Sequence, residues 1–202
     1  AAVLEVCPRL GVHCLAAFDE ASESAMRAEA ARLGGDTVNI RGNPGLFNSL
    51  GGRKVAAILD LLHASGAFHR PRLMVDEGGA RRRVMLSLRT GTRTAGHPGW
   101  THGGLTSLLM DEIAGQAFAH FVQPTRGLGV TANLTVDYAS PLPTAKDLLV
   151  VAGVGEVDGR KVRIDVEVRD GPPEGGSGDS DGGCDGEVFA RGSALFVVLA
   201  KD

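Results

Sequence analysis

One short stretch of the chain combines residue types that are able to do chemistry together. The run WTHGGL from Trp100 to Leu105 is a glycine-rich turn that precedes a helical pattern, and Asp111 lies partway along that helix. A helix N-terminus offers unpaired backbone N–H groups and a partial positive charge, and glycine lets a ligand approach the backbone closely. The turn therefore predicts a site that polarises a carbonyl and holds an oxyanion. Asp111 is the candidate base or nucleophile.

Asp111 lies too far from this turn to act there within one chain. His102 and Asp111 are nine positions apart (111 − 102 = 9), which is roughly 13 Å at about 1.5 Å per helical residue. A second copy with its helix antiparallel would bring its Asp111 near Gly103 of the first. If the site is catalytic, the spacing predicts a two-fold homodimer with shared active sites. The alternative is an Asp111 at a subunit seam or on the solvent face, because most isolated carboxylates on helices are solvated.

The elements that must position these residues are one long helix and an antiparallel sheet. The apolar pattern predicts a helix from about Gly104 to Phe121, and Pro124 breaks the chain after it. Alternation and turn signals predict strands at residues 68–75, 83–89, 130–138, 148–157, 161–169 and 188–199. This order implies an α+β fold in which the sheet curls around the single apolar helix.

The strand at 130–138 shows the cleanest alternation. It predicts two faces, with Val130, Ala132, Leu134 and Val136 on the apolar one and Thr131, Asn133, Thr135 and Asp137 on the polar one. Thr131 is therefore expected on the polar face of its strand.

The chain divides into an accessory part and a main domain. Residues 1–66 predict an N-terminal helical extension, with helices at 22–33 and 53–64. Residues 67–202 form the main domain. Within it, residues 171–186 are acidic, glycine-rich and poor in hydrophobic residues, which indicates an inserted loop between two strands.

Composition excludes some classes of protein. The net charge of −3 argues against a nucleic-acid binder, which normally carries a basic face. No apolar run approaches the roughly 18 residues needed to span a membrane. The three cysteines (Cys7, Cys14 and Cys184) are odd in number and match no zinc spacing, which suits a reducing compartment. The cytoplasm is the expected location, with the mitochondrion as the alternative.

Three motifs in order carry a resemblance to a known family. The segments GHPGWTHGGLTSLLMDE, VTANLTVDYASPLP and VDGRKV resemble those of hotdog-fold acyl-CoA thioesterases. The branch is that of the phenylacetate-pathway enzyme and the thioesterase superfamily member proteins, and the resemblance covers roughly residues 67–202. It implies a hotdog fold, an antiparallel curved sheet wrapped around one long central helix. It also implies hydrolysis of acyl-CoA thioesters to a free acid and CoA.

The resemblance also implies roles for four residues. Asp111 matches the carboxylate that activates water or attacks the thioester carbon. The N–H of Gly103 matches the oxyanion donor, and His102 matches the histidine that orients the thioester and shapes the turn. Thr131 matches a hydroxyl that orients the water across the dimer.

Substrate-binding residues are expected around the same turn and at a hairpin tip. Gly104 belongs to the turn itself. Several relatives carry an asparagine about six residues before the histidine of the turn, whereas this chain has Gly96 and His97 there, so His97 is the candidate substitute. Arg160 and Lys161 are the candidate partners of the CoA phosphates, the alternative being that both are simply solvated.

Other functions stay open from the sequence. One is a non-catalytic acyl-CoA-binding or regulatory hotdog protein, and another is a hotdog dehydratase of hydroxyacyl thioesters. The spacing of His97, His102 and Asp111 matches no helical zinc motif, so neither a metal nor another cofactor is expected. The expected partners are acyl-CoA and a second copy of the chain, with a tetramer built from two dimers as the larger alternative.

Overall fold

An antiparallel sheet dominates the described part of the chain. The computed structural model describes residues 38–39, 62, 65–76, 82–171 and 186–200. The sheet order is β1-β2-β3-β7-β8-β9-β6, and every pair of neighbours is antiparallel. The bounds of the strands are β1 Val38–Asn39, β2 Phe68–Asp76, β3 Arg83–Thr90, β6 Gly129–Tyr138, β7 Asp147–Asp158, β8 Lys161–Asp170 and β9 Val188–Val198.

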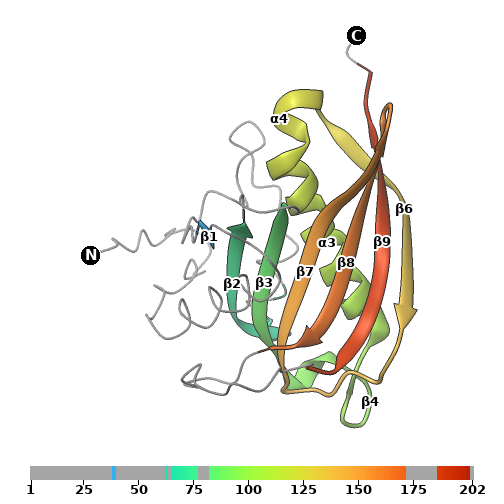
Figure 1. The fold of residues 1–202 in the computed structure, drawn as a ribbon. Helices are drawn as coiled ribbons and strands as arrows, with labels where there is room; N and C mark the ends of the chain where they lie inside the picture. Colours follow the sequence, from blue (N-terminus) through green and yellow to red (C-terminus); the bar gives the residue numbers. More distant parts are fainter. Residues whose placement is uncertain (1–37, 40–61, 63–64, 77–81, 172–185, 201–202) are drawn as a thin grey trace.

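One long helix lies in the curve of this sheet. Helix α3 spans Gly103–Phe121, and the short helix α4 (Gln123–Arg126) follows it at the far end. Figure 1 shows the strands bending around α3, with the start of the helix near β4 and its end near α4. This confirms the expected hotdog arrangement.

The core lies between α3 and the concave face of the sheet. Each large side chain buried there contributes about 1.5–3 kcal/mol relative to an exposed one. The helix supplies seven buried residues to it: Thr106, Leu109, Met110, Ile113, Ala114, Ala117 and Phe118. In β8, four alternate residues are buried, as the sequence predicts: Val162, Ile164, Val166 and Val168. This packing fixes the orientation of α3, and with it the direction in which each of its polar side chains points.

Strand β6 departs from the alternation that its sequence predicts. Thr131 pairs with Phe196 while Asn133 pairs with the next residue of β9, so Ala132 is the extra residue of a β-bulge. Directly opposed residues of an antiparallel pair share a face, and the ring of Phe196 stacks on that of Phe118 in α3. Thr131 therefore lies on the face of the sheet that turns toward the helix, although its side chain is exposed. Its expected grouping on one face with Asn133 and Thr135 is wrong.

A small hairpin between β3 and α3 was not expected. Strands β4 (Ala95–His97) and β5 (Trp100–Thr101) pair around a turn in which Gly99 has a φ of 82°, a left-handed conformation that glycine adopts without steric cost. The glycine-rich turn thus begins as a two-stranded hairpin. These strands are too short for a periodic pattern to reveal them.

Most of the N-terminal extension, residues 1–66, lies outside the described residues, as do all three cysteines and residues 172–185. Val38–Asn39 of this extension form β1 and pair with β2, which differs from an all-helical segment. Leu62 is helical and packs against the core. Within the described ranges, no helix is long and apolar enough to cross a membrane.

Candidate active site at the start of helix α3

His102 is the N-cap of α3 and uses one glycine N–H to hold the turn. Its Nδ1 accepts a hydrogen bond from the Gly104 N–H at 2.9 Å, as cap side chains do for the unpaired donors of a first turn. The His102 N–H donates to the Thr94 carbonyl at 2.7 Å. An accepting Nδ1 places the proton of the neutral ring on Nε2. The Gly104 N–H is therefore already hydrogen-bonded within the turn.

Gly103 keeps its N–H free while its carbonyl is held. No described group accepts a hydrogen bond from the Gly103 N–H. Its carbonyl lies 3.0 Å from the Tyr138 hydroxyl and 3.1 Å from the Ser107 hydroxyl. Gly103 is the first residue of α3, at the positive end of the helix. This N–H is thus available as a hydrogen-bond donor at the positive end of the helix.

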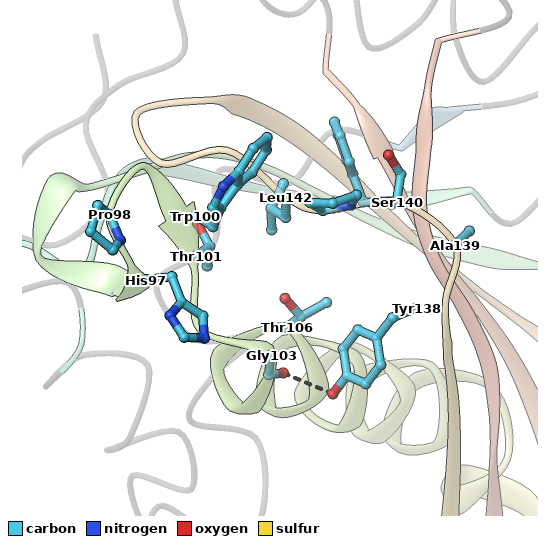
Figure 2. A pocket seen from close by; sticks show the side chains of 12 residues that line it. His97, Pro98, Trp100, Thr101, Gly103, Thr106, Tyr138, Ala139, Ser140 and Leu142 are labelled. Atoms are coloured by element: carbon cyan, nitrogen blue, oxygen red, sulfur yellow. Dashed lines mark hydrogen bonds between the residues drawn. The ribbon is translucent and has the colours of Figure 1, made fainter.

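A cavity of about 710 Å³ opens beside Gly103. Its volume falls within the range of about 300–1,000 Å³ that is typical of small-molecule sites. Figure 2 shows side chains from the β4–β5 hairpin, the first turn of α3 and the segment after β6 arranged around it. The lining residues are His97, Pro98, Trp100, Thr101, Gly103, Thr106, Tyr138, Ala139, Ser140, Pro141, Leu142 and Phe189. The structure therefore brings His97 and Gly103 to one cavity.

The segment after β6 holds the β4–β5 hairpin in place. The Thr101 N–H donates to the Leu142 carbonyl at 2.7 Å, and the Thr144 N–H donates to the Gly99 carbonyl at 2.9 Å. A Cβ on Gly96 would lie 3.0 Å from Cδ2 of His102. The backbone there approaches the histidine too closely for an asparagine side chain without a shift of the turn.

Asp111 lies away from this cavity, as the helix rise predicts. It follows Gly103 by eight positions (111 − 103 = 8), roughly 12 Å along the axis, and it does not line the cavity. Its Oδ1 is buried and has no hydrogen-bond partner among the described residues. An unpaired buried carboxylate oxygen is costly.

The flank of α3 that carries Asp111 faces the edge strand β6. Ser107 lies four residues earlier, one helical turn away on the same side, and contacts Tyr138 of β6. Phe118 lies seven residues later, two turns away, and a Cβ on Gly129 of β6 would meet its ring at 2.4 Å. Asp111 therefore lies between these two contacts, on the flank that the helix turns toward β6.

Thr131 joins Asp111 on this flank because of the bulge in β6. Gly129 and Thr131 both face the helix, since their β9 partners Val198 and Phe196 are buried in the core. Within one chain, the Asp111 carboxylate and the Thr131 hydroxyl thus lie on the same side of α3. The Gly103 turn lies about two helical turns away from Asp111. The expected site residues fall into two groups rather than one.

Two adjacent carboxylates give this part of α3 a negative field. Burial raises the pKa of Glu112, and the charge of the neighbouring Asp111 raises it further. The raised pKa means that the Glu112 carboxylate binds a proton more readily than it does in water. In the described part of the chain, no group of three or more His, Cys, Asp or Glu side chains is placed to bind a metal ion.

Arg160 and Lys161 lie at the other end of the sheet from the turn. Lys161 pairs with Val197 of β9, whereas Tyr138, which contacts Gly103, pairs with Ala190. Seven residues of β9 separate the two levels (197 − 190 = 7), roughly 24 Å at about 3.4 Å per residue. Both side chains are exposed. Within one chain they do not meet the Gly103 turn.

Tyr138 is the site residue that the sequence did not indicate. It lines the cavity, contacts the turn and leaves 56% of its surface exposed. The sequence offered an aromatic residue at the end of an alternating strand, which is ordinary. Its partner Gly103 lies 35 positions earlier in the chain, so only the docking of β6 beside α3 reveals the contact.

The fold and the turn define a class of protein. An antiparallel sheet curved around one helix, with a glycine turn at the start of that helix, is the hotdog arrangement. Residues 98–177 match the thioesterase superfamily. This part of the chain is therefore similar to thioesterase-superfamily domains.

Individual proteins are also similar to this chain. The acyl-coenzyme A thioesterase THEM4 of Xenopus laevis is 33% identical over 120 residues, which cover 59% of this chain and 47% of the relative. The protein of the same name from Rattus norvegicus is 30% identical over 124 residues, with coverages of 61% and 46%. Zebrafish thioesterase superfamily member 2 has a solved structure that is 19% identical, with a TM-score of 0.49 and coverages of 63% and 81%. The chain spans about half the length of the curated relatives it matches.

Proposed function

We propose that this chain is an acyl-CoA thioesterase that hydrolyses acyl-CoA to a free acid and CoA. The observation that carries the proposal is the buried, unpaired Oδ1 of Asp111 in a domain whose helix also starts with a free Gly103 N–H. A base and an oxyanion donor are the two groups that thioester hydrolysis requires. The names of the curated relatives support the same activity.

In the proposed reaction, the thioester oxygen accepts a hydrogen bond from the Gly103 N–H. Asp111 takes a proton from a water molecule that Thr131 orients, and this water attacks the thioester carbon. The tetrahedral intermediate collapses, the C–S bond breaks, and the proton passes to the CoA sulfur. His102 holds the turn through the Gly104 N–H, and His97 contacts the substrate from the cavity wall.

The proposal requires two copies of the chain, because Asp111 and Gly103 are separated within one. Strand β6 is at the edge of the sheet, where unpaired backbone groups are available to a second chain. Val130 and Tyr138 are half-exposed on this strand. Antiparallel pairing of β6 with its copy places Asp111 of one subunit toward Gly103 of the other, in a homodimer with two shared sites.

The same dimer also assigns a role to Arg160 and Lys161. In an antiparallel pair through β6, the hairpin end of one subunit lies at the Gly103 end of the other. We keep these two side chains as partners of the CoA phosphates of the other subunit's site. We also keep the cytoplasm as the proposed location.

Asp111→Asn is the direct test. The variant keeps the shape of the side chain and loses the base, so kcat for acyl-CoA hydrolysis should fall roughly 100- to 10,000-fold, while the dimer measured by sedimentation persists. The assay should use a panel of acyl-CoA chain lengths, with hydration of enoyl-CoA measured in parallel. Undiminished hydrolysis would reject the role of Asp111. Tight binding without turnover would indicate a binding protein, and hydration alone would indicate a dehydratase.

A further inference from the structure

Strand β6 forms one edge of the sheet (Figure 1) and carries a row of backbone groups that point away from β9. The carbonyl of Thr135 points at β9, because its oxygen lies 2.0 Å and its carbon 3.1 Å from a Cβ placed on Gly192. The Ala139 N–H likewise donates to the Phe189 carbonyl of β9. Successive residues of a strand alternate in the direction of their backbone groups. The residues of β6 that point outward, here called the outward row, are therefore Leu134, Val136 and Tyr138.

The β-bulge at Ala132 sets the beginning of the outward row. Before the bulge, the Leu128 carbonyl accepts a hydrogen bond from the Leu199 N–H, so even-numbered residues point at β9 there. After the bulge, odd-numbered residues do so. The regular outward row thus begins after Ala132 and ends with the strand at Tyr138. Val136 is its centre.

We infer that β6 pairs with β6 of a second copy through the outward row, with Val136 on the two-fold axis. In this register Val136 lies opposite Val136 of the second copy, and Leu134 lies opposite its Tyr138. The inference rests on the proposed function, in which Asp111 of one subunit acts at Gly103 of the other. It adds the register that this shared site requires.

Two contacts give the level of Asp111 along β6. Tyr138 contacts Gly103, and a Cβ on Gly129 would meet the ring of Phe118. Nine residues of β6 (138 − 129 = 9) therefore accompany fifteen of α3 (118 − 103 = 15). Because Asp111 follows Gly103 by eight positions, just over half of that length, it lies beside about residue 133 of β6.

This level places the axis near the centre of the outward row. For Asp111 of the second copy to reach the glycine turn, residue 133 of that copy must lie close to Tyr138, and the axis then passes midway between these two positions. Opposed residues of an antiparallel pair share a face of the sheet, whereas successive residues alternate faces. The axis must therefore pass through a pair of identical residues, which leaves Thr135 and Val136.

The outward row decides between Thr135 and Val136. An axis at Val136 places every member of the row opposite another member, so that their N–H and C=O groups bond one another. An axis at Thr135 would instead set Tyr138 opposite Ala132 of the bulge. With the axis at Val136, the Thr135 hydroxyl also lies opposite the Asp137 carboxylate of the second copy, which places a donor opposite an acceptor.

Disulfide cross-linking of Thr135→Cys and Asp137→Cys tests the register. Residues 135 and 137 point their backbone groups at β9, so between the two copies they form a non-hydrogen-bonded pair with Cα atoms about 4.5 Å apart. A disulfide requires a separation below about 7 Å. In two copies of the same variant, the cysteines would lie on a diagonal, roughly 8 Å apart. The mixture of the two variants should form a disulfide-linked dimer, and each variant alone should not.

Non-reducing electrophoresis and intact mass measure the linked dimer after dissociation, reassociation and mild oxidation. All variants carry serine in place of Cys7, Cys14 and Cys184, so that only the introduced thiols react. Random reassociation makes about half of the dimers mixed, so about half of the chains should be linked, and a reductant should release them. Arg163→Cys mixed with Thr135→Cys is the control for chance collision, because Arg163 is exposed on β8, two strands from the edge. This control should give no linked dimer.

The outcomes separate the register from the proposed function. Linking of Thr135→Cys alone, linking of Asp137→Cys alone, or no linking in any sample would overturn the register even if the chain hydrolyses acyl-CoA. Linking confined to the mixture, in a protein that leaves acyl-CoA intact, would support the register and reject the proposed function.

Discussion

At the scale of single residues, the N–H groups of Gly103 and Gly104 differ in their hydrogen bonding. The Gly104 N–H caps the helix through His102, and the Gly103 N–H stays free beside the cavity. Two glycines that look equivalent in the sequence are thus inequivalent in the fold. The distinction predicts that a change confined to one N–H will separate the structure of the turn from its chemistry.

Gly103→Pro makes that change. Proline lacks the N–H and is well tolerated at the first position of a helix, and the φ of −64° and ψ of 129° at His102 suit a residue that precedes proline. Loss of the oxyanion donor should lower kcat roughly 100- to 1,000-fold, as measured by steady-state hydrolysis of acyl-CoA. Gly103→Ala is the matched control, because it adds the same Cβ near Tyr138 and keeps the N–H. Equal losses in the two variants would show that crowding, rather than the N–H, is responsible.

At the scale of elements, β6 depends on a close approach by β9. A Cβ on Gly192 would lie 2.0 Å from the carbonyl oxygen of Thr135 in β6 and 3.0 Å from Cε of Met110 in α3. This glycine lets the edge strand come close enough to present Thr131 and Tyr138 to the helix. The position of the site thus depends on a residue that takes no part in it.

Gly192→Ala should therefore destabilise the fold. Overpacking of this kind costs about 1–3 kcal/mol, since the backbone of β6 must move to accept the methyl group. Gly153→Ala in β7 is the control, because the nearest atom to its new Cβ is 3.6 Å away, and loss of a strand glycine should raise stability by about 0.5–1 kcal/mol. Urea unfolding at one fixed protein concentration measures both. Similar midpoints for the two variants would contradict the close approach.

At the scale of the whole molecule, the proposed site belongs to two chains. The helix separates Gly103 from Asp111 by roughly 12 Å, and the flank that carries Asp111 lies beside the edge strand. Catalysis and assembly are then inseparable in this proposal. A mixture of two inactive variants tests it.

Asp111→Asn and Gly103→Pro should complement one another. In a heterodimer of the two, one site carries both substitutions and the other carries neither. Random reassociation of equal amounts produces heterodimers as about half of the dimers, so the mixture should recover about a quarter of the wild-type turnover. The unmixed variants, taken through the same dissociation and reassociation, are the control. If no activity returns although heterodimers form, both groups act within one chain.

The sequence alone determined much of the architecture of this protein. The period of the apolar residues located α3 and the main strands to within a few residues, because burial against one face leaves a regular pattern. The distance between Gly103 and Asp111 also followed from the sequence, because the rise of a helix is fixed. The glycine-rich turn before an apolar pattern likewise indicated where the helix begins.

Only the tertiary structure decided which strand residues face the helix. The bulge at Ala132 reverses the face of Thr131, and a periodic pattern cannot reveal one extra residue in a ladder. The Tyr138 contact with Gly103 joins residues 35 positions apart, and it exists because β6 docks beside α3. Local spacing dictates helices and strands, whereas the register between distant strands dictates which side chains meet.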